Sequence, residues 1–292
     1  MRVRLVRGPP RVAAATCIVV FSFGCFTGCG AGRAASDSTN MSQPTIGRVN
    51  TTVRVLQMNL CNSGRADCYS GGRAVSMAVG LIHEHRPDMV SLNEVCREDL
   101  RVLKEAMSAT FPATAVASAF TSAKDRQTQA PVRCQDGQEF GDGVLVAVSA
   151  PAVATRSYSG VYPVQDPNDS EERVWVCVDL ATRFSACTTH TSSSNRAIAL
   201  NQCRYLLNSV LPGLGRRNGV APFIIGADLN LAAHGSPGPQ SCLPSGYQRA
   251  DDHGLQDVVV SPTIGIRSHS VIDMQGTTDH PGLLVDVELS RH

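Results

Sequence analysis

The segment PDMVSLNEV (residues 87–95) contains the pattern that decides the fold. A proline opens it, apolar residues fill its centre, and Glu94 closes the strand that this pattern predicts. The segment FIIGADLN (residues 223–230) has the same arrangement, with Asp228 and Asn230 after a very apolar run. Catalytic groups are commonly presented by the ends of a rigid sheet. The two segments therefore predict strands whose carboxyl ends carry functional side chains.

Three more predicted strands begin or end at polar residues. Asn59 ends the strand 53–59, His190 ends the strand 184–190, and Asp279 and His280 precede the strand 283–289. Taken singly, an Asn or Asp at a strand end is most often a turn former. A lone His is usually a satisfied surface or core residue. The information lies in the order of all five groups along the chain.

The remaining periodicity predicts helices and strands throughout the chain. We expect helices at 71–86, 97–110 and 195–211, and further strands at 88–94, 143–148, 173–180, 222–227 and 255–260. Strands outnumber helices, and no internal repeat is present. This mixture predicts an α/β class with sheets covered by helices, in one domain over residues 51–292.

Together these features resemble the endonuclease/exonuclease/phosphatase superfamily, which includes DNase I-like nucleases, over about residues 52–290. The strongest matches are PDMVSLNEV, IIGADLN and TDHPGLLVDV. The segment Gly141–Val146 is similar to the central Gly-Asn strand of the family, and Glu172-Arg173 also fits. The resemblance implies a four-layer α/β sandwich, in which two packed, mostly antiparallel mixed sheets are flanked by helices.

The resemblance and the chemistry of the residues both point to a divalent-metal-dependent phosphoesterase. Carboxylate and amide oxygens suit a hard cation such as Mg²⁺, with Mn²⁺ or Ca²⁺ as alternatives. We expect Glu94 to be the principal metal ligand, supported by Asn59 and Asp279. The metal is expected to polarise a phosphoryl oxygen and to stabilise the charge that develops there.

The expected proton acceptor is His280, which takes the proton of the attacking water directly or through Asp228. The family often has an Asp that precedes an aromatic-rich strand and pairs with the last His. Asp257 is the best match, although valines replace the aromatics, and Asp273 is the alternative. No carboxylate in the sequence is apparent as a partner of His190, the first His of the family pattern. Two further side chains are expected to donate hydrogen bonds to the non-bridging phosphate oxygens, Asn230 and His190.

Residues 1–28 have the pattern of an export signal, with Arg-bearing, apolar and small-residue parts in that order. The sequence Phe26-Thr27-Gly28-Cys29 resembles a bacterial lipobox, which implies that Cys29 carries a lipid. Residues 29–50 are small and polar and are expected to form a flexible tether. The alternative is an ordinary secreted protein that is cleaved within residues 30–36. Either way we expect an exported monomer, and the lipoprotein form would meet the membrane only through its lipid anchor.

Eight cysteines follow this segment, an even number that suggests disulfides in an exported chain. Cys177 and Cys187 lie equidistant from a turn between two predicted strands, so they can face each other. Cys61 and Cys68 bracket a short Gly/Asp loop. The remaining cysteines are then expected to pair as Cys96–Cys134 and Cys203–Cys242.

The charge balance limits the class of partner. Lys and Arg number 26 against 25 Asp and Glu, and four of the Arg lie in the first 28 residues. The rest of the chain has 22 basic and 25 acidic residues, a net charge of −3. This balance disfavours a protein held on nucleic acid mainly by a basic surface. No later apolar tract approaches the ~18 residues of a membrane span, which excludes a channel or transporter.

Composition also ranks the substrates. The domain length and the cysteines resemble secreted DNase I-like nucleases, so a nuclease or general phosphodiesterase ranks first. A phospholipid or sphingomyelin phosphodiesterase ranks second, because 5% aromatic residues and a single Trp provide little for membrane contact. A phosphomonoesterase ranks third. The alternative from another class is a non-catalytic binding lipoprotein on the same fold, which the complete set of site residues disfavours.

Overall fold

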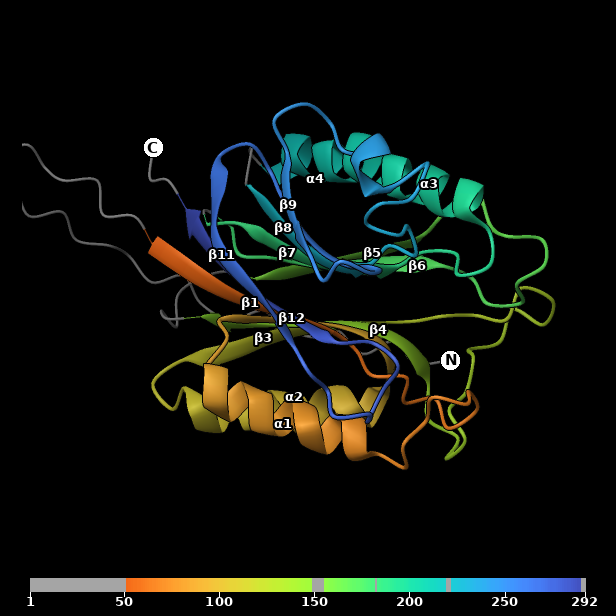
Figure 1. Ribbon diagram of the computed structural model, residues 1–292. Coiled ribbons are helices and arrows are strands. Elements are labelled where there is room, and N and C mark those ends of the chain that lie inside the picture. Colours follow the sequence, from red (N-terminus) through yellow and green to blue (C-terminus); the bar gives the residue numbers. More distant parts are fainter. Residues whose placement is uncertain (1–50, 149–154, 182, 219–221, 290–292) are drawn as a thin grey trace, which may run out of the picture. The chain divides into compact units, whose positions relative to one another are not determined.

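The computed structural model describes residues 51–289, except for 149–154, 182 and 219–221. The expected signal segment 1–28, Cys29 and the tether 29–50 lie outside the described residues. Within the described part, two six-stranded sheets face each other and helices cover their outer faces (Figure 1). This is the four-layer α/β sandwich that the sequence predicts.

The first sheet has the strand order β11-β12-β1-β2-β4-β3. Its pairs are antiparallel except for β1 with β2, which are parallel and joined by a helix. Two helices pack on its outer face (Figure 1), namely α1 (Arg73–His85) and α2 (Arg97–Thr110). The strands are β1 (Thr51–Asn59), β2 (Met89–Cys96), β3 (Ala115–Ser122), β4 (Phe140–Val148), β11 (Ile264–Ile272) and β12 (Gly282–Leu289).

The second sheet has the strand order β5-β6-β7-β8-β10-β9, and only β7 and β8 are parallel. The crossover between them contains α3 (Arg196–Tyr205), a π-helical turn (Leu206–Val210) and α4 (Leu211–Asn218). A short 3-10 helix (Pro239–Ser241) follows β8. The strands are β5 (Arg156–Val161), β6 (Val174–Asp179), β7 (Ser185–His190), β8 (Phe223–Asp228), β9 (Gln248–Asp251) and β10 (Gln256–Val260).

The layers follow from the two-residue period of the strands, because successive side chains point to opposite faces of a sheet. In β1, Val53 and Val55 pack in the core between the two sheets, whereas Leu56 and Met58 pack beneath α1 and α2. In β10, Val258 packs between the sheets and Val259 packs on the side of α3. Both sheets are therefore buried on two faces, and the inner strands β2, β4, β6, β7, β8 and β10 are buried at nearly every position.

The described residues contain four disulfides, and they are the four pairs expected from the sequence. Cys61–Cys68 and Cys177–Cys187 close short segments, and the second pair lies directly opposite across β6 and β7. Cys96–Cys134 and Cys203–Cys242 close segments of 38 and 39 residues. No helix in the described ranges is long and apolar enough to cross a membrane.

Candidate active site

The inner faces of the two sheets change from apolar to polar along the strands. In β1, Val55 belongs to the core between the sheets, and Gln57 and Asn59 follow at two-residue steps on the same face. In β8, Ile224 is followed in the same way by Gly226 and Asp228. The side chains that gather here are called the polar cluster below. Its members are Asn59, Glu94, His190, Asp228, Asn230, Asp279 and His280.

Glu94 enters the polar cluster because β2 is irregular at its end. The register between β2 and β4 shifts between Leu92 and Val95, and Glu94 has a φ of 55°. A bulge of this kind re-aims a side chain, and a positive φ is strained for a residue other than glycine. Asn59 Nδ2 donates to Glu94 Oε1 at 2.9 Å. Burial raises the pKa of Glu94, and the nearby Asp228 raises it further.

Asp228 is fully buried at the centre of the polar cluster. Its Oδ2 accepts hydrogen bonds from Asn59 Nδ2 at 3.1 Å and from Gln256 Nε2 at 2.7 Å. Its Oδ1 accepts from the backbone N–H of Asn230, which has a φ of 49°. The Asn230 side chain donates to the backbone oxygen of Thr191 at 2.9 Å. Two strained backbones, at Glu94 and Asn230, thus meet in one site.

His280 and Asp279 join the polar cluster from the turn that precedes β12. Thr278 Oγ1 donates to the backbone oxygen of Asn59 at 3.0 Å and holds this turn against the end of β1. His280 Nε2 lies 3.6 Å from Asp228 Oδ2 and 3.7 Å from Asp279 Oδ1. The Asp279 side chain is 57% exposed and that of His280 16%. The cluster is therefore reached by solvent on this side.

His190 is held as a neutral ring. Arg173 Nη1 lies 3.0 Å from His190 Nδ1, and burial together with Arg173 places the pKa of His190 well below its usual value. A guanidinium can only donate, so Nδ1 accepts and the proton of the neutral ring is on Nε2. Two carboxylates in turn hold Arg173, since Asp169 Oδ2 accepts from its Nη2 at 2.7 Å and Glu171 Oε1 lies 3.4 Å from its Nη1. The Arg173 guanidinium is thus the partner of His190, for which no carboxylate partner is apparent in the sequence.

The structure corrects the role expected of Asp257. Asp257 follows Gln256 in β10 and points to the opposite face, where Arg249 of β9 pairs with it. Gln256 is the residue that faces His280, with its Nε2 3.4 Å from His280 Nδ1. The physical reason is the strand period, because Val258 packs between the sheets and thereby fixes Gln256 on the inner face. Asp273, the alternative, accepts a local backbone hydrogen bond from Gln275 as a turn residue.

Sequence reasoning missed a set of buried polar residues behind the polar cluster. Asn93 Nδ2 donates to Asp142 Oδ1 at 2.9 Å, and burial raises the pKa of Asp142 to about 8. Burial likewise raises the pKa of Glu171 to about 7. Further residues of this buried set could have been found from the strand period, by looking for a polar residue two positions before a predicted site residue on the same strand. Residues with this spacing are Gln57, two positions before Asn59, and Thr188, two positions before His190.

Comparisons of the whole fold extend these observations. No family model matches the sequence, and no curated protein matches it. Solved structures do match. An endonuclease/exonuclease/phosphatase family protein from Bacteroides thetaiotaomicron superposes with a TM-score of 0.61 at 14% identity, over 84% of this chain and 99% of that one. The fold is that of the endonuclease/exonuclease/phosphatase proteins.

Two further structures share this endonuclease/exonuclease/phosphatase fold. ANGEL2, a 2′,3′-cyclic phosphatase, has a TM-score of 0.59 and 12% identity, with 83% of this chain and 97% of that chain covered. A mannosyl-6-phosphatase from Bacteroides thetaiotaomicron has a TM-score of 0.56 and 15% identity, with 80% and 99% covered. The likeness therefore extends over nearly all of the described residues.

The donor set of the polar cluster fits a hard divalent cation. Glu94 and Asp279 offer carboxylate oxygens on its solvent side, and carboxylates with waters are the usual protein ligands of Mg²⁺. The repulsion between Glu94 and Asp228 would be relieved by a cation. Asn59, expected as a supporting ligand, meets both carboxylates through its amide nitrogen, while its Oδ1 accepts from the backbone of Cys61 at 3.0 Å. In this structure it orients Glu94 and Asp228.

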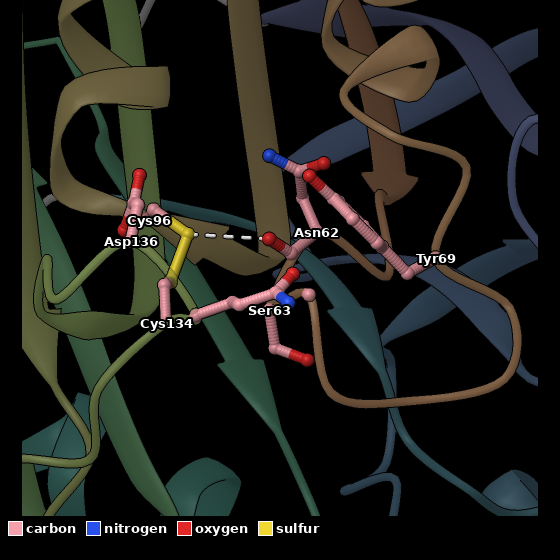
Figure 2. A pocket seen from close by; sticks show the side chains of 8 residues that line it. Asn62, Ser63, Tyr69, Cys96, Cys134 and Asp136 are labelled. Atoms are coloured by element: carbon pink, nitrogen blue, oxygen red, sulfur yellow. Dashed lines mark hydrogen bonds between the residues drawn. A yellow bond between two sulfur atoms is a disulfide. The ribbon is translucent and has the colours of Figure 1, made fainter.

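A pocket of about 220 Å³ lies beside the carboxyl ends of β1 and β2 (Figure 2). The loop after β1 and the Cys96–Cys134 disulfide line it, and Asn62 of that loop donates its backbone N–H to Glu94 O at 2.9 Å. Asn62 Nδ2 donates to Asp99 Oδ2 at 2.8 Å. None of the polar cluster's side chains lines this pocket. The residues predicted from the sequence lie in the polar cluster and not in this pocket, so the polar cluster is the candidate active site.

Proposed function

We propose that this protein is an exported, divalent-metal-dependent phosphoesterase that hydrolyses phosphodiester bonds, as a nuclease does. The observation that carries the proposal is the continuous contact from Glu94 through Asn59 and Asp228 to His280 at a solvent-accessible edge. Structures of the same fold include a 2′,3′-cyclic phosphatase and a mannosyl-6-phosphatase, which supports action on a phosphate ester.

The residues of the polar cluster are proposed to have separate roles in hydrolysis. A phosphodiester is an anion, so its hydrolysis needs charge neutralisation, an activated water and stabilisation of the developing charge. A divalent cation held by Glu94 and Asp279 would neutralise charge and polarise a phosphoryl oxygen. His190 presents its Nε2–H, and with Asn230 it is proposed to donate to the non-bridging oxygens. The Asp228–His280 pair is proposed to accept the proton of the water.

Export is proposed on the disulfides. Four of them within one domain are typical of proteins that fold in an oxidising compartment. We propose that Cys29 carries the lipid that retains the protein at the membrane, with simple secretion as the alternative. The large apolar side chains exposed in the described residues are Tyr69, Val161 and Val271, which lie on a loop, β5 and β11. They give no specific support to a phospholipid substrate.

The test uses the purified protein with bis-(p-nitrophenyl) phosphate as a diester and p-nitrophenyl phosphate as a monoester. We expect Mg²⁺-dependent turnover of the diester that EDTA abolishes. Glu94→Gln should weaken Mg²⁺ binding in calorimetry and abolish turnover, whereas Glu98→Gln, on the exposed face of α2, should do neither. His280→Ala should keep Mg²⁺ binding and lower turnover by ~100-fold or more.

Three results would count against this proposal. Turnover that persists in EDTA would exclude metal dependence, and equal behaviour of Glu94→Gln and Glu98→Gln would exclude Glu94 as a ligand. Preference for the monoester would instead favour a phosphomonoesterase, the activity that the mannosyl-6-phosphatase of the same fold carries in its name.

A further inference from the structure

We infer that Gln256 is a positioning residue that fixes the tautomer of His280, so that the ring keeps its proton on Nε2 and donates from it. The contact is between Gln256 Nε2 and His280 Nδ1, at 3.4 Å. Gln256 is fully buried, whereas the His280 side chain is partly exposed. An amide nitrogen only donates, so Nδ1 has to be the accepting nitrogen of the neutral ring.

The orientation of the Gln256 amide is itself fixed, because each end meets a partner of known character. Its nitrogen lies 2.7 Å from Asp228 Oδ2, a carboxylate oxygen that accepts. Its oxygen accepts from Gln57 Nε2 at 2.9 Å. Turning the amide over would place oxygen against the Asp228 carboxylate and nitrogen against the Gln57 nitrogen, and both hydrogen bonds would be lost.

Gln57 is fixed in the same way from deeper in the sandwich. Its Nε2 also donates to Asn93 Oδ1 at 2.7 Å, and its Oε1 accepts from Ser91 Oγ at 2.6 Å. Asn93 cannot turn over, because its Oδ1 accepts from the backbone N–H of Asp228 at 3.0 Å. A backbone N–H can only donate, so it fixes which end of the Asn93 amide faces Asp228. The orientation of Asn93 fixes that of Gln57, which fixes that of Gln256, and Gln256 in turn sets the tautomer of His280.

The neighbours on the other side of the ring favour the same tautomer. His280 Nε2 faces Asp228 Oδ2 at 3.6 Å and Asp279 Oδ1 at 3.7 Å. Both are carboxylate oxygens, for which a protonated Nε2 is the matching group. The neighbours of both ring nitrogens therefore favour the Nε2–H form.

This inference deepens the proposed function by dividing the roles within the Asp228–His280 pair. A neutral ring with its proton on Nε2 has no free lone pair on that nitrogen, so it cannot take a proton there. His280 is then the donor of the pair, through its Nε2–H, and Asp228 is the group that accepts the proton of the water. The statement about the tautomer does not depend on any activity.

The experiment is a long-range ¹H–¹⁵N spectrum of the imidazole nitrogens in the full-length protein labelled with ¹⁵N-histidine. The His280 signals are assigned from their absence in His280→Gln. In the neutral ring, at alkaline pH, we expect a pyrrole-type Nε2 and a pyridine-type Nδ1 in the wild-type protein. A protonated Nδ1 in the wild-type protein would overturn the inference without any variant.

Two matched variants of neighbouring residues then test the cause. Gln256→Glu places a carboxyl group against Nδ1, and we expect the proton to move to Nδ1. Asp257→Asn changes the next residue, which faces Arg249, and should leave the His280 signals unchanged. Unchanged signals in Gln256→Glu, with its backbone amide spectrum intact, would show that Gln256 does not set the tautomer. So would a shift of the proton in Asp257→Asn.

Activity gives a separate measurement, which rests on the proposed function. Gln256→Glu should lower kcat for bis-(p-nitrophenyl) phosphate about tenfold or more while KM changes little, because a ring with its proton on Nδ1 can no longer donate from Nε2 to the developing charge. If the tautomer is as inferred but the wild-type protein has no turnover, the proposed function fails and the positioning role stands. If turnover is present and the tautomer is the other one, the positioning role fails alone.

Discussion

Gly226→Ala is expected to destabilise the fold strongly, because Gly226 in β8 lies directly against the buried Ser91 and Gln57 side chains of the facing sheet. A Cβ at this position would lie 1.8 Å from Ser91 Oγ and 2.7 Å from Gln57 Oε1. Both of these side chains are fully buried, so neither can move into solvent. The methyl group must therefore displace the Ser91–Gln57 hydrogen bond of 2.6 Å or separate the sheets.

The expected magnitude has two parts. Inserting a methyl group into a well-packed interior costs about 1–3 kcal/mol. Leaving a buried hydrogen-bonding group without its partner costs about 1–3 kcal/mol more. We expect a loss of about 4 kcal/mol in the free energy of unfolding, measured by urea titration. The fluorescence of Trp175, the single tryptophan and a buried one, reports the transition.

Two further variants make the test specific. Gly80→Ala is the matched control, because Gly80 lies in α1 and nothing is within 4 Å of an added Cβ. It should stabilise the protein by about 0.5–1 kcal/mol, as expected for Gly replaced by Ala in a helix. Ser91→Ala removes the oxygen that the new methyl meets, so the Ser91→Ala/Gly226→Ala pair should lose less than the two single variants together. A loss below about 1 kcal/mol for Gly226→Ala, or strict additivity, would refute this reasoning.

Two other predictions concern disulfides and pH. Replacing both cysteines by Ala should cost about 2–3 kcal/mol at Cys177–Cys187, which closes 10 residues, and about 4 kcal/mol at Cys203–Cys242, which closes 39. Urea titration of both variants tests this order, and the reverse order would contradict it. Because burial raises the pKa of Asp142 to about 8, the folded protein holds a proton that the unfolded chain releases. Stability is then lost as the pH rises toward about 8, by up to ~1.4 kcal/mol per pH unit. Asp142→Asn should reduce this slope between about pH 5 and about pH 8, and an unchanged slope would contradict the assignment.

The sequence was most informative where a local pattern and a polar strand end coincide. The helix at 97–110 and the strand ends at Asn59, His190 and Asp228 lie where the pattern predicts them, whereas β2 continues past Glu94 to Cys96. Four strands were not predicted, and each occupies an edge of its sheet: β3, β5, β9 and β11. The sequence of β3, AVASAFTS, has few β-branched residues and therefore little intrinsic strand propensity. Pairing with β4 holds it in the sheet.

The error at Asp257 has a different origin. The segment Val258–Val260 is apolar at every position, since β10 is buried on both faces. A strand of this kind has no alternation to show which of two adjacent polar residues points inward. The pairing of Gln256 with Asp228 across β10 and β8, together with the packing of Val258 between the sheets, fixes the register. A carboxylate beside a predicted site was therefore preferred to the amide that actually faces His280.

The order of side chains along β1 explains why the polar network is built from amides. Val55 lies in the apolar core, Gln57 two residues later meets only neutral groups, and Asn59 two residues beyond contacts Glu94 and Asp228. Charges far from water are costly, whereas amides can donate and accept at a buried position without any charge. The amide layer thus separates the carboxylates from the apolar core while still fixing their orientation. The same reasoning accounts for Asp142, because its raised pKa keeps it protonated at neutral pH, so that this buried acid also stays neutral.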